Sequence, residues 1–293
     1  MRKTAVAMIW LLMMLLITLP VCAQVVELPL DLSGGMPYSP EGRLSETSYE
    51  DESISVTVEK MRWEETTCYV ARIRIAHPSQ LRTAPAYAFN RNQTAPIGDI
   101  AARVNAVLAI NGDYCTYQMK SGSYLLRQGT LYMNDPNPRR DILIIDRNGD
   151  FIVEKRAEKE TMKKYNPDEL ANCFNFGPAL VVNGEKLSDD YKEDFNYSHD
   201  RHRRAAIAQV KKGELEYLCV VTDGSREEKN GGLTIAEFAE LLYSLGVETA
   251  YNLDGGNTTS MLLCGDKQNA ILQGYHRPMS DIIYFASAVL PQE

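Results

Sequence analysis

The sequence predicts an α+β fold in which a mixed, mostly antiparallel β-sheet core and a few packing helices form a single domain. Three observations predict this class. Many short apolar segments alternate with polar residues at the two-residue period of a strand. Several neighbouring segments are joined by Asn-Gly pairs or other glycine-containing turns, which are typical of hairpins. Few segments have the 3.6-residue period of a helix, and no internal repeat is present.

The N-terminus predicts export from the cell. Arg2 and Lys3 precede an apolar run over 5–19, and a short exit with a small residue, Ala23, follows. This is the layout of a secretory signal peptide over 1–23, with cleavage after Ala23. A retained membrane anchor is the alternative, although the apolar run is short for a membrane span.

Composition divides the rest of the chain. Residues 24–52 are rich in Pro, Ser, Gly and acid and predict a linker or extended arm, and 53–293 predict the folded domain. The formal net charge of the whole chain is −8 at pH 7, and signal cleavage would make it more negative. Such a charge disfavours nucleic acid and anionic membranes as partners. An anionic substrate would therefore need a local basic site.

Cysteines beyond the signal peptide are odd in number. They are Cys68, Cys115, Cys173, Cys219 and Cys264. At least one thiol is therefore free or pairs between molecules. Export permits one or two disulfides, whose pairing stays open. No Cys-x-x-Cys spacing occurs, which disfavours a zinc site.

The first half of the domain predicts strands and one short helix. Two strands are expected over 53–58 and 68–75, where apolar residues alternate with polar ones. A short helix over 99–104 leads into a buried strand over 106–110.

Three hairpins follow. The paired segments are 142–145 with 151–153, 179–182 with the chain after Asn183-Gly184, and 205–210 with 215–221. An Asn-Gly pair supplies the positive φ angles of a tight hairpin turn, both here and at Asn148-Gly149.

One helix has clear end signals. Thr234 and Glu237 form a capping box, and Gly246 ends the helix. Its apolar stripe consists of Ile235, Phe238, Leu241, Leu242 and Leu245. A strand over 247–250 comes next, and the final strand is expected over 281–290.

The segment from Asn252 to Ser260 concentrates polar side chains between two apolar runs. It surrounds Gly255 and Gly256 with two asparagines, one aspartate and three hydroxyl groups. Glycine allows positive φ and a close approach to a ligand. A β-turn whose side chains bond their own backbone is the simpler interpretation, but it explains the two glycines better than the other side chains.

Four polar clusters lie at the ends of predicted strands. They are Asn111-Gly-Asp-Tyr114, Asp200-Arg-His-Arg-Arg204, Thr222-Asp-Gly-Ser-Arg226 and the segment just described. Each cluster alone is typical of a turn or a solvated face. Strand ends of one sheet can converge, so together the clusters predict one pocket.

A set of motifs occurs in one fixed order. They are Asn111-Gly-Asp-Tyr114, Gly177-Pro-Ala-Leu180, Arg204-Ala-Ala-Ile-Ala208, Asp223-Gly224, Gly232-Leu-Thr234 and Asn252-Leu-Asp-Gly-Gly-Asn-Thr-Thr259. In this order they resemble the phosphodiester glycosidase family, which has many exported bacterial members. The resemblance covers about 106–290. Arg277-Pro278 also resembles a near-terminal Arg-Pro of the family.

The chain departs from the family pattern at three places. Asp113 stands where the family commonly has glycine, Asn257 stands where it has a third glycine, and Ala205 stands where it has Thr or Ser. The first two changes add bulk at the expected site. Asn257 also begins an N-glycosylation sequon, and a sugar there would block the site, which favours a bacterial origin.

The resemblance implies hydrolysis of the bond between a sugar's anomeric carbon and the oxygen of a phosphodiester. The enzyme would be a secreted glycosidase acting on sugar-1-phosphodiesters, either N-acetylglucosamine-like or in a cell-surface polymer. A cation must hold the phosphate, and Arg204 is the first candidate because its planar fork matches phosphate oxygens. A carboxylate must stabilise the anomeric cation or activate water. Asp254 is the first candidate, Asp223 the second, and Asp113, which is peculiar to this chain, the third.

The expected substrate-binding residues surround these groups. They are Asn111, Asp113, Asn252, Gly255, Gly256, Thr258 and Thr259. No cofactor is expected. A divalent cation held by Asp113, Asp223 and Asp254 is the alternative. Two other functions stay open, namely a non-catalytic exported polysaccharide-binding domain and a phosphodiesterase that cuts the P–O bond.

Overall fold

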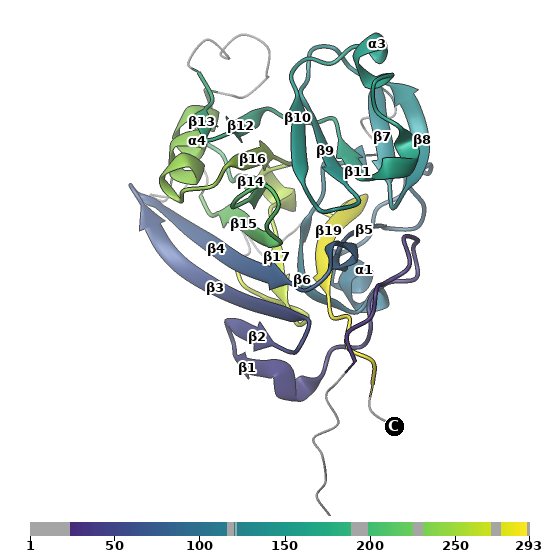
Figure 1. Cartoon of the computed structure of the whole chain (residues 1–293). Coiled ribbons are helices and arrows are strands. Elements are labelled where there is room, and N and C mark those ends of the chain that lie inside the picture. The colour runs from purple at the N-terminus through teal and green to yellow at the C-terminus, as the bar shows by residue number, and fades with distance from the viewer. Residues whose placement is uncertain are drawn as a thin grey trace, which may run out of the picture.

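The computed structural model describes residues 24–115, 120, 122–188, 199–224, 231–270 and 277–291. The expected signal peptide over 1–23 lies outside this range. The described strands form three sheets around a shared core (Figure 1).

The largest sheet has nine strands in spatial order β1 (Arg43–Ser45), β2 (Ser48–Glu50), β3 (Ile54–Trp63), β4 (Thr66–Ile75), β15 (Glu216–Thr222), β14 (Ala205–Gln209), β16 (Thr249–Asn252), β12 (Ala179–Val182) and β13 (Glu185–Lys186). A five-stranded sheet runs β10 (Phe151–Glu154), β9 (Ile142–Asp146), β11 (Leu170–Phe174), β7 (Ser123–Arg127) and β8 (Thr130–Asp135). The other five-stranded sheet runs β18 (Asp266–Lys267), β17 (Met261–Leu263), β6 (Ala106–Asn111), β19 (Asp281–Ala286) and β5 (Leu81–Pro85).

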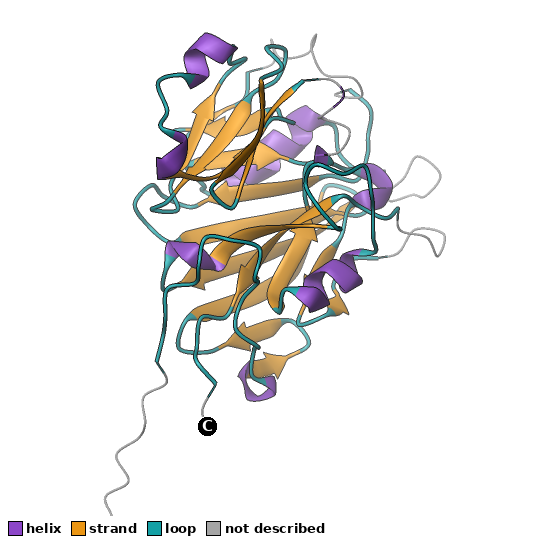
Figure 2. Cartoon of the chain, turned by 90° about the vertical axis from the view of Figure 1, so that its right-hand side faces the viewer, coloured by secondary structure: helices purple, strands orange, loops and turns teal. Residues whose placement is uncertain are grey.

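Strand pairing between the described strands is antiparallel throughout, including β14 with β15 and β6 with β19. The predicted α+β class with a mostly antiparallel core is confirmed. Three short α-helices are described, and four 3₁₀ turns lie at Pro40–Gly42, Pro78–Gln80, Pro167–Glu169 and Gly256–Thr258. The helices lie on the outside of the sheets (Figure 2).

The inner faces of the three sheets pack on one another. Ile73, Ile110 and Ile145 each come from a different sheet and belong to the same apolar cluster. One helix covers the outer face of each sheet, namely α4 (Ile235–Ser244), α1 (Ile97–Arg103) and α3 (Lys159–Met162). The site loops are thus mounted on strands that are buried on both faces, as expected of a rigid scaffold.

Helix α4, whose ends have the clearest sequence signals, forms as its sequence indicates. Thr234 Oγ1 accepts a hydrogen bond from the Glu237 backbone N–H, and the Glu237 carboxylate accepts one from Thr234, which completes the capping box. Phe238, Leu241 and Leu242 are fully buried against the nine-stranded sheet. Gly246 follows with φ +76°.

Residues 24–52, expected to be a linker or extended arm, include strands β1 and β2. The β1–β2 pair extends the edge of the nine-stranded sheet beside β3. Val25 and Met36 make isolated bridges to Val289 and Ser287, near the described C-terminus. No described helix is long and apolar enough to cross a membrane.

Candidate active site

Three of the four predicted clusters lie at one end of the nine-stranded sheet, as far as they are described; Ser225 and Arg226 of the third cluster lie outside the described residues. Ala205 pairs with Val221, and Ala206 pairs with Asn252. Because these pairings are antiparallel, the start of β14 lies between the ends of β15 and β16. Asp223 and Asp254 follow β15 and β16, so the arginine run before β14 stands between the two aspartates.

Asn111 joins the fourth cluster to the same place. Its side-chain Nδ2 donates to the backbone carbonyl of Asp254 at 2.6 Å, and its Oδ1 accepts from the Ser260 N–H at 3.1 Å. The residue ends β6, and Ile110 pairs with Met261 at the start of β17. Both ends of the amide are therefore used to hold the 254–260 loop.

Asp254 is the carboxylate at the centre of this loop. Its Oδ1 accepts from the Gly255 N–H at 2.9 Å, and its Oδ2 lies 2.8 Å from Thr258 Oγ1. Arg277 Nη2 forms an ion pair with the same Oδ2. The side chain keeps 15% of its surface exposed. These contacts fix the orientation of the carboxylate while one side stays accessible.

Arg277 is an accessible cation beside this loop. Its side chain is 42% exposed, and its guanidinium lies 4.9 Å from the centre of the Tyr114 ring. The Arg277 N–H also donates to the carbonyl of Asn257 at 3.1 Å. Tyr114 has φ +58°, a left-handed conformation that turns the chain after Asn111. The Tyr114 ring thereby lies against the Arg277 guanidinium. A planar, ring-supported guanidinium suits recognition of a phosphate.

Burial dominates the electrostatics of Asp254. Desolvation raises the pKa of this carboxyl above its ordinary value of 3.8. Arg277, Thr258 and the Gly255 N–H each favour the charged form and oppose the rise. A carboxylate with this balance is a reasonable base or charge stabiliser at neutral pH.

Gly255 and Gly256 bring the loop onto the backbone of Arg203. The Gly256 N–H donates to the Arg203 carbonyl at 3.0 Å. A Cβ at Gly255 would lie 2.6 Å from that carbonyl oxygen, whereas a Cβ at Gly256 would meet nothing within 4 Å. Gly256 instead needs its φ of +64°. The loop thus needs its two glycines for different physical reasons. Gly255 allows close approach to the Arg203 backbone, and Gly256 adopts a positive φ.

The two alanine substitutions are expected to differ. Gly255→Ala should cost about 3 kcal/mol of stability, since backbone must move to admit the methyl group. Gly256→Ala should cost about 1 kcal/mol, the strain of a left-handed residue. Denaturant unfolding of both variants measures the difference. Equal losses, or a larger loss at Gly256, would contradict the close approach to Arg203.

Asp223 and Arg203 form a second charged group. Arg203 Nη2 lies 3.6 Å from Asp223 Oδ1, and both side chains are buried. Burial raises the pKa of Asp223, and Arg203 and a hydrogen bond from Tyr69 oppose the rise. Lys267 lies nearby with its Nζ 3.4 Å from Ser260 Oγ. Burial, aided by Arg203, lowers the pKa of Lys267 to about 8.

Arg204 points to a different neighbourhood from Arg203. Its Nε donates to the Leu233 carbonyl at 2.9 Å and its Nη2 to the Asp200 carbonyl at 2.7 Å. Burial lowers the pKa of Arg204 to about 10. These contacts give Arg204 a loop-holding role before α4.

Asp113 turns into the interior. Its Oδ1 accepts from Arg127 Nη2 at 2.7 Å, and it is 1% exposed. Arg127 also lies 3.7 Å from Asp281 and stacks 4.1 Å from the centre of the Phe174 ring. Burial raises the pKa of Asp113, and Arg127 opposes this. The added bulk at this position therefore packs between sheets, away from the Asp254 loop.

The remaining predicted residues line the loop from within. Asn252 Nδ2 donates to the Gly177 carbonyl at 2.8 Å, and Asn252 is 1% exposed. Thr259 is fully buried. Asn252 Oδ1 and Thr259 Oγ1 have no hydrogen-bond partner within the described residues. Of the predicted substrate-binding set, Gly255 and Gly256 are the most exposed.

No three His, Cys, Asp or Glu side chains of the described residues gather as a metal site would require. Asp113, Asp223 and Asp254 instead face Arg127, Arg203 and Arg277. All five described cysteines are in the thiol form, and four of them are buried.

The residues of the candidate site lie within a match to a known protein family. Residues 104–286 match a family model described as phosphodiester glycosidase. The chain belongs to the phosphodiester glycosidase family. The match begins at the end of α1 and includes Asn111, Asp223, Asp254 and Arg277. The predicted family membership is thus confirmed. A search of curated protein sequences finds no significant match.

Solved structures support the fold of this family member. The zebrafish N-acetylglucosamine-1-phosphodiester α-N-acetylglucosaminidase catalytic domain, auto-inhibited by its pro-peptide, aligns with a TM-score of 0.62 and 15% identity. The alignment covers 83% of this chain and 87% of that one. A hypothetical protein from Synechocystis aligns with a TM-score of 0.52 and 16% identity, over 80% of this chain and 62% of that one.

Sequence reasoning missed several residues of this candidate site. The Arg-Pro resemblance points to Arg277, but it does not indicate the direct contact with Asp254. Tyr114 lies in a predicted cluster, and no sequence pattern indicates its contact with Arg277. Lys267 and Tyr69 had no signal, because their neighbours come from distant strands. The family's Arg-Pro motif was the one available pointer to the Asp254 partner.

Proposed function

We propose that this protein is a secreted glycosidase that hydrolyses the sugar–phosphate bond of sugar-1-phosphodiesters. Family membership supports a phosphodiester glycosidase at the level of reaction class. The single observation that carries the finer proposal is the ion pair between Asp254 and Arg277 on an accessible loop that contains two glycines. No metal or other cofactor has a role in the proposal.

The Asp254–Arg277 pair matches the charges of the transition state. When the anomeric C–O bond breaks, positive charge develops on the sugar carbon and negative charge on the leaving phosphate oxygen. Asp254 would stabilise the anomeric carbon or activate water, and Arg277 would bind the phosphate. A phosphate monoester is a good leaving group, so strong help from a general acid is not required. Water supplies the new hydroxyl of the sugar.

Neighbouring residues position this pair. Thr258 and the Gly255 N–H hold both carboxylate oxygens of Asp254, and Asn111 holds its backbone. Asp223, paired with buried Arg203, is the second carboxylate candidate. Asn111 and Thr258 therefore act through Asp254 in this proposal, with Arg204 holding the neighbouring loop.

The physiological setting follows from the N-terminus and the charge. The expected signal peptide over 1–23 supports secretion or a cell-surface location. The sequon at Asn257 supports a bacterial host, because a sugar there would block the site. The partner is a carbohydrate or sugar phosphate. The negative net charge argues against nucleic acid.

A turnover assay tests this function. Purified protein without residues 1–23 is incubated with a panel of sugar-1-phosphodiesters, and free sugar and phosphate monoester are quantified. Stoichiometric release of both supports the glycosidase. Saturable binding of the panel without any turnover would instead support the exported polysaccharide-binding domain.

The pH dependence should reflect burial of Asp254. Catalysis needs the ionised carboxylate, and burial favours the protonated form, so the acid limb of kcat/KM should lie above the pKa of 3.8 of an ordinary aspartate. Activity is therefore expected to fall as pH drops through this raised pKa. Initial rates at low substrate concentration across acidic to neutral pH measure the limb. A rate that stays flat below about pH 4 would contradict this role of Asp254.

A further inference from the structure

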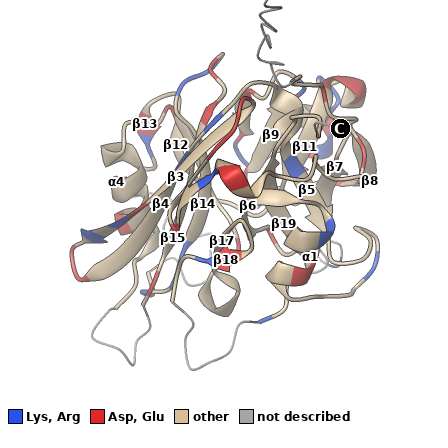
Figure 3. Cartoon of the chain, turned by 90° about the horizontal axis from the view of Figure 1, so that it is seen from below, with Lys and Arg blue, Asp and Glu red and all other residues tan. Residues whose placement is uncertain are grey.

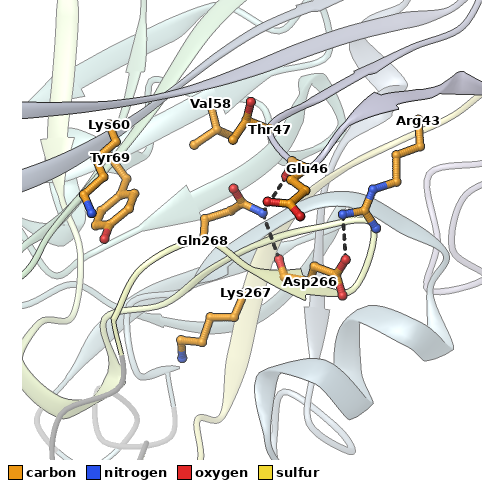
Figure 4. A pocket seen from close by; sticks show the side chains of 9 residues that line it. All are labelled: Arg43, Glu46, Thr47, Val58, Lys60, Tyr69, Asp266, Lys267 and Gln268. Atoms are coloured by element: carbon orange, nitrogen blue, oxygen red, sulfur yellow. Dashed lines mark hydrogen bonds and ion pairs between the residues drawn. The ribbon is translucent and has the colours of Figure 1, made fainter.

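A pocket of about 510 Å³ opens beside the candidate active site. It lies between the β1–β2 pair, strands β3 and β4, and strand β18 (Figure 4). Its lining includes Arg43, Lys60, Tyr69, Asp266, Lys267 and Gln268. Lining residues 43–69 precede the part of the chain that matches the family model, whereas 266–268 lie inside it. The pocket thus combines family residues with an N-terminal segment.

Two lining residues connect the pocket to the catalytic loop. Tyr69 interacts electrostatically with Asp223, the carboxylate that follows β15. Lys267 Nζ lies 3.4 Å from Ser260 Oγ, and the Ser260 backbone is held by Asn111. Asn111 in turn holds the backbone of Asp254. The pocket and the proposed reaction centre are therefore separated by a short series of direct contacts.

The charge of the pocket differs from that of the chain as a whole. Arg43 and Asp266 form an ion pair of 2.6 Å and offset each other. The rest of the lining carries the ammonium groups of Lys60 and Lys267 against the carboxylate of Glu46. Acidic and basic segments are mixed over the molecule and lie side by side near β18 (Figure 3). On a chain with net charge −8, a cationic pocket attracts anions locally.

The other lining groups suit a sugar or polyol. The Tyr69 ring and the Val58 side chain offer apolar surface, and Thr47 offers a hydroxyl group. Gln268 Nε2 bridges the carbonyls of Glu46 and Asp266 at 3.1 and 3.2 Å, which fixes the rim of the pocket. The volume is that of a small-molecule site. A phosphate alone would leave most of it empty.

We propose that this pocket binds a phosphorylated sugar or polyol on the alcohol side of the substrate, next to the diester that is cleaved. The inference rests on the proposed function and deepens it. In a chain of sugar or polyol units joined by phosphodiesters, the unit after the cleaved bond carries a further phosphate. The ammonium groups of Lys60 and Lys267 bind that phosphate. The part of the pocket lined by the Tyr69 ring contacts the carbon skeleton of the sugar or polyol. The substrate class is a repeating sugar-phosphate or polyol-phosphate polymer.

Two diesters of the same sugar test the subsite. One has methanol as its alcohol, and the other has glycerol 3-phosphate. The wild type should favour the second by about tenfold, expressed in KM and reduced at high salt. Lys60→Met should remove about three- to fivefold of that preference and leave the methyl diester unchanged, because Lys60 is exposed and lies outside the reaction centre. Lys60→Glu should abolish the preference.

The matched control is Lys159→Met on α3, an exposed lysine of another sheet's outer helix. It should keep the full preference. Equal KM values for the two diesters in the wild type, or equal losses in the two lysine variants, would overturn the subsite.

Direct binding separates the subsite from the reaction. Titration with glycerol 3-phosphate is performed on the wild type and on Lys60→Met, whether or not either diester is turned over. Weaker binding to Lys60→Met supports the subsite even if the proposed reaction fails. Turnover of the methyl diester with no difference in glycerol 3-phosphate binding would refute the subsite and leave the proposed reaction standing.

Discussion

Replacing Asp254 with asparagine is expected to reduce kcat/KM on a sugar-1-phosphodiester by on the order of 10³-fold or more. The amide keeps the size of the carboxyl group but carries no charge to stabilise the anomeric carbon, and it cannot accept a proton from water. The effect should fall mainly on kcat, because the lost interaction belongs to the transition state. Asp168→Asn, an exposed aspartate on another face, should leave the rate unchanged.

The same variant should remain folded. Burial raises the pKa of Asp254, so the ionised carboxylate costs folding free energy at neutral pH, and the amide avoids this cost. Loss of the charged hydrogen bonds from Thr258 and Arg277 opposes that gain. The net change should stay within about 1 kcal/mol. An inactive variant with a Tm near that of the wild type supports a catalytic carboxylate, and a rate within tenfold of the wild type would exclude it.

Replacing Arg277 with methionine is expected to lower kcat/KM by about 10²- to 10³-fold. The variant loses the exposed cation that would hold the phosphate, so KM should rise and kcat should fall together. It also removes the charge that favours ionised Asp254. The acid limb of the pH profile should therefore move to higher pH, a readout that a merely structural role of Arg277 would not produce.

Two further variants sharpen the result for Arg277. Arg277→Lys keeps the charge but lacks the planar fork, so it should recover only part of the loss. Guanidinium added to Arg277→Ala should restore activity in a saturable way. Arg139→Met supplies an exposed arginine as the control. An unshifted acid limb together with a normal KM would mean that Arg277 does not hold the phosphate.

The convergence of the polar clusters could be predicted because local signals agree. The polar clusters follow or precede apolar strands, and antiparallel pairing brings those ends together. Capping signals at Thr234 and Gly246 fixed the helix that precedes β16. The predicted strand over 247–250 was placed too early, since β16 spans Thr249–Asn252. Pairing with β14 sets this register, and the local apolar run does not reveal it.

The partners of the site residues could not be predicted in the same way. Arg203 and Arg204 have different partners because adjacent residues in an extended backbone point to opposite faces. The sequence does not indicate toward which of the two faces each arginine points. The sequence predicts that Asp113 adds bulk at the site, but its carboxylate pairs with Arg127 on β7 in the interior. Arg277 follows Asp254 by 23 residues, and no local pattern indicates their ion pair.

The central claim is cleavage between the anomeric carbon and oxygen, and isotope labelling tests it most directly. Hydrolysis of a sugar-1-phosphodiester is carried out in water enriched in ¹⁸O, and the released phosphate monoester is examined by mass spectrometry or phosphorus NMR. If Asp254 and Arg277 act as proposed, the phosphate monoester is unlabelled and the new oxygen enters the sugar. Label on the phosphate would show attack at phosphorus and would contradict the glycosidase account.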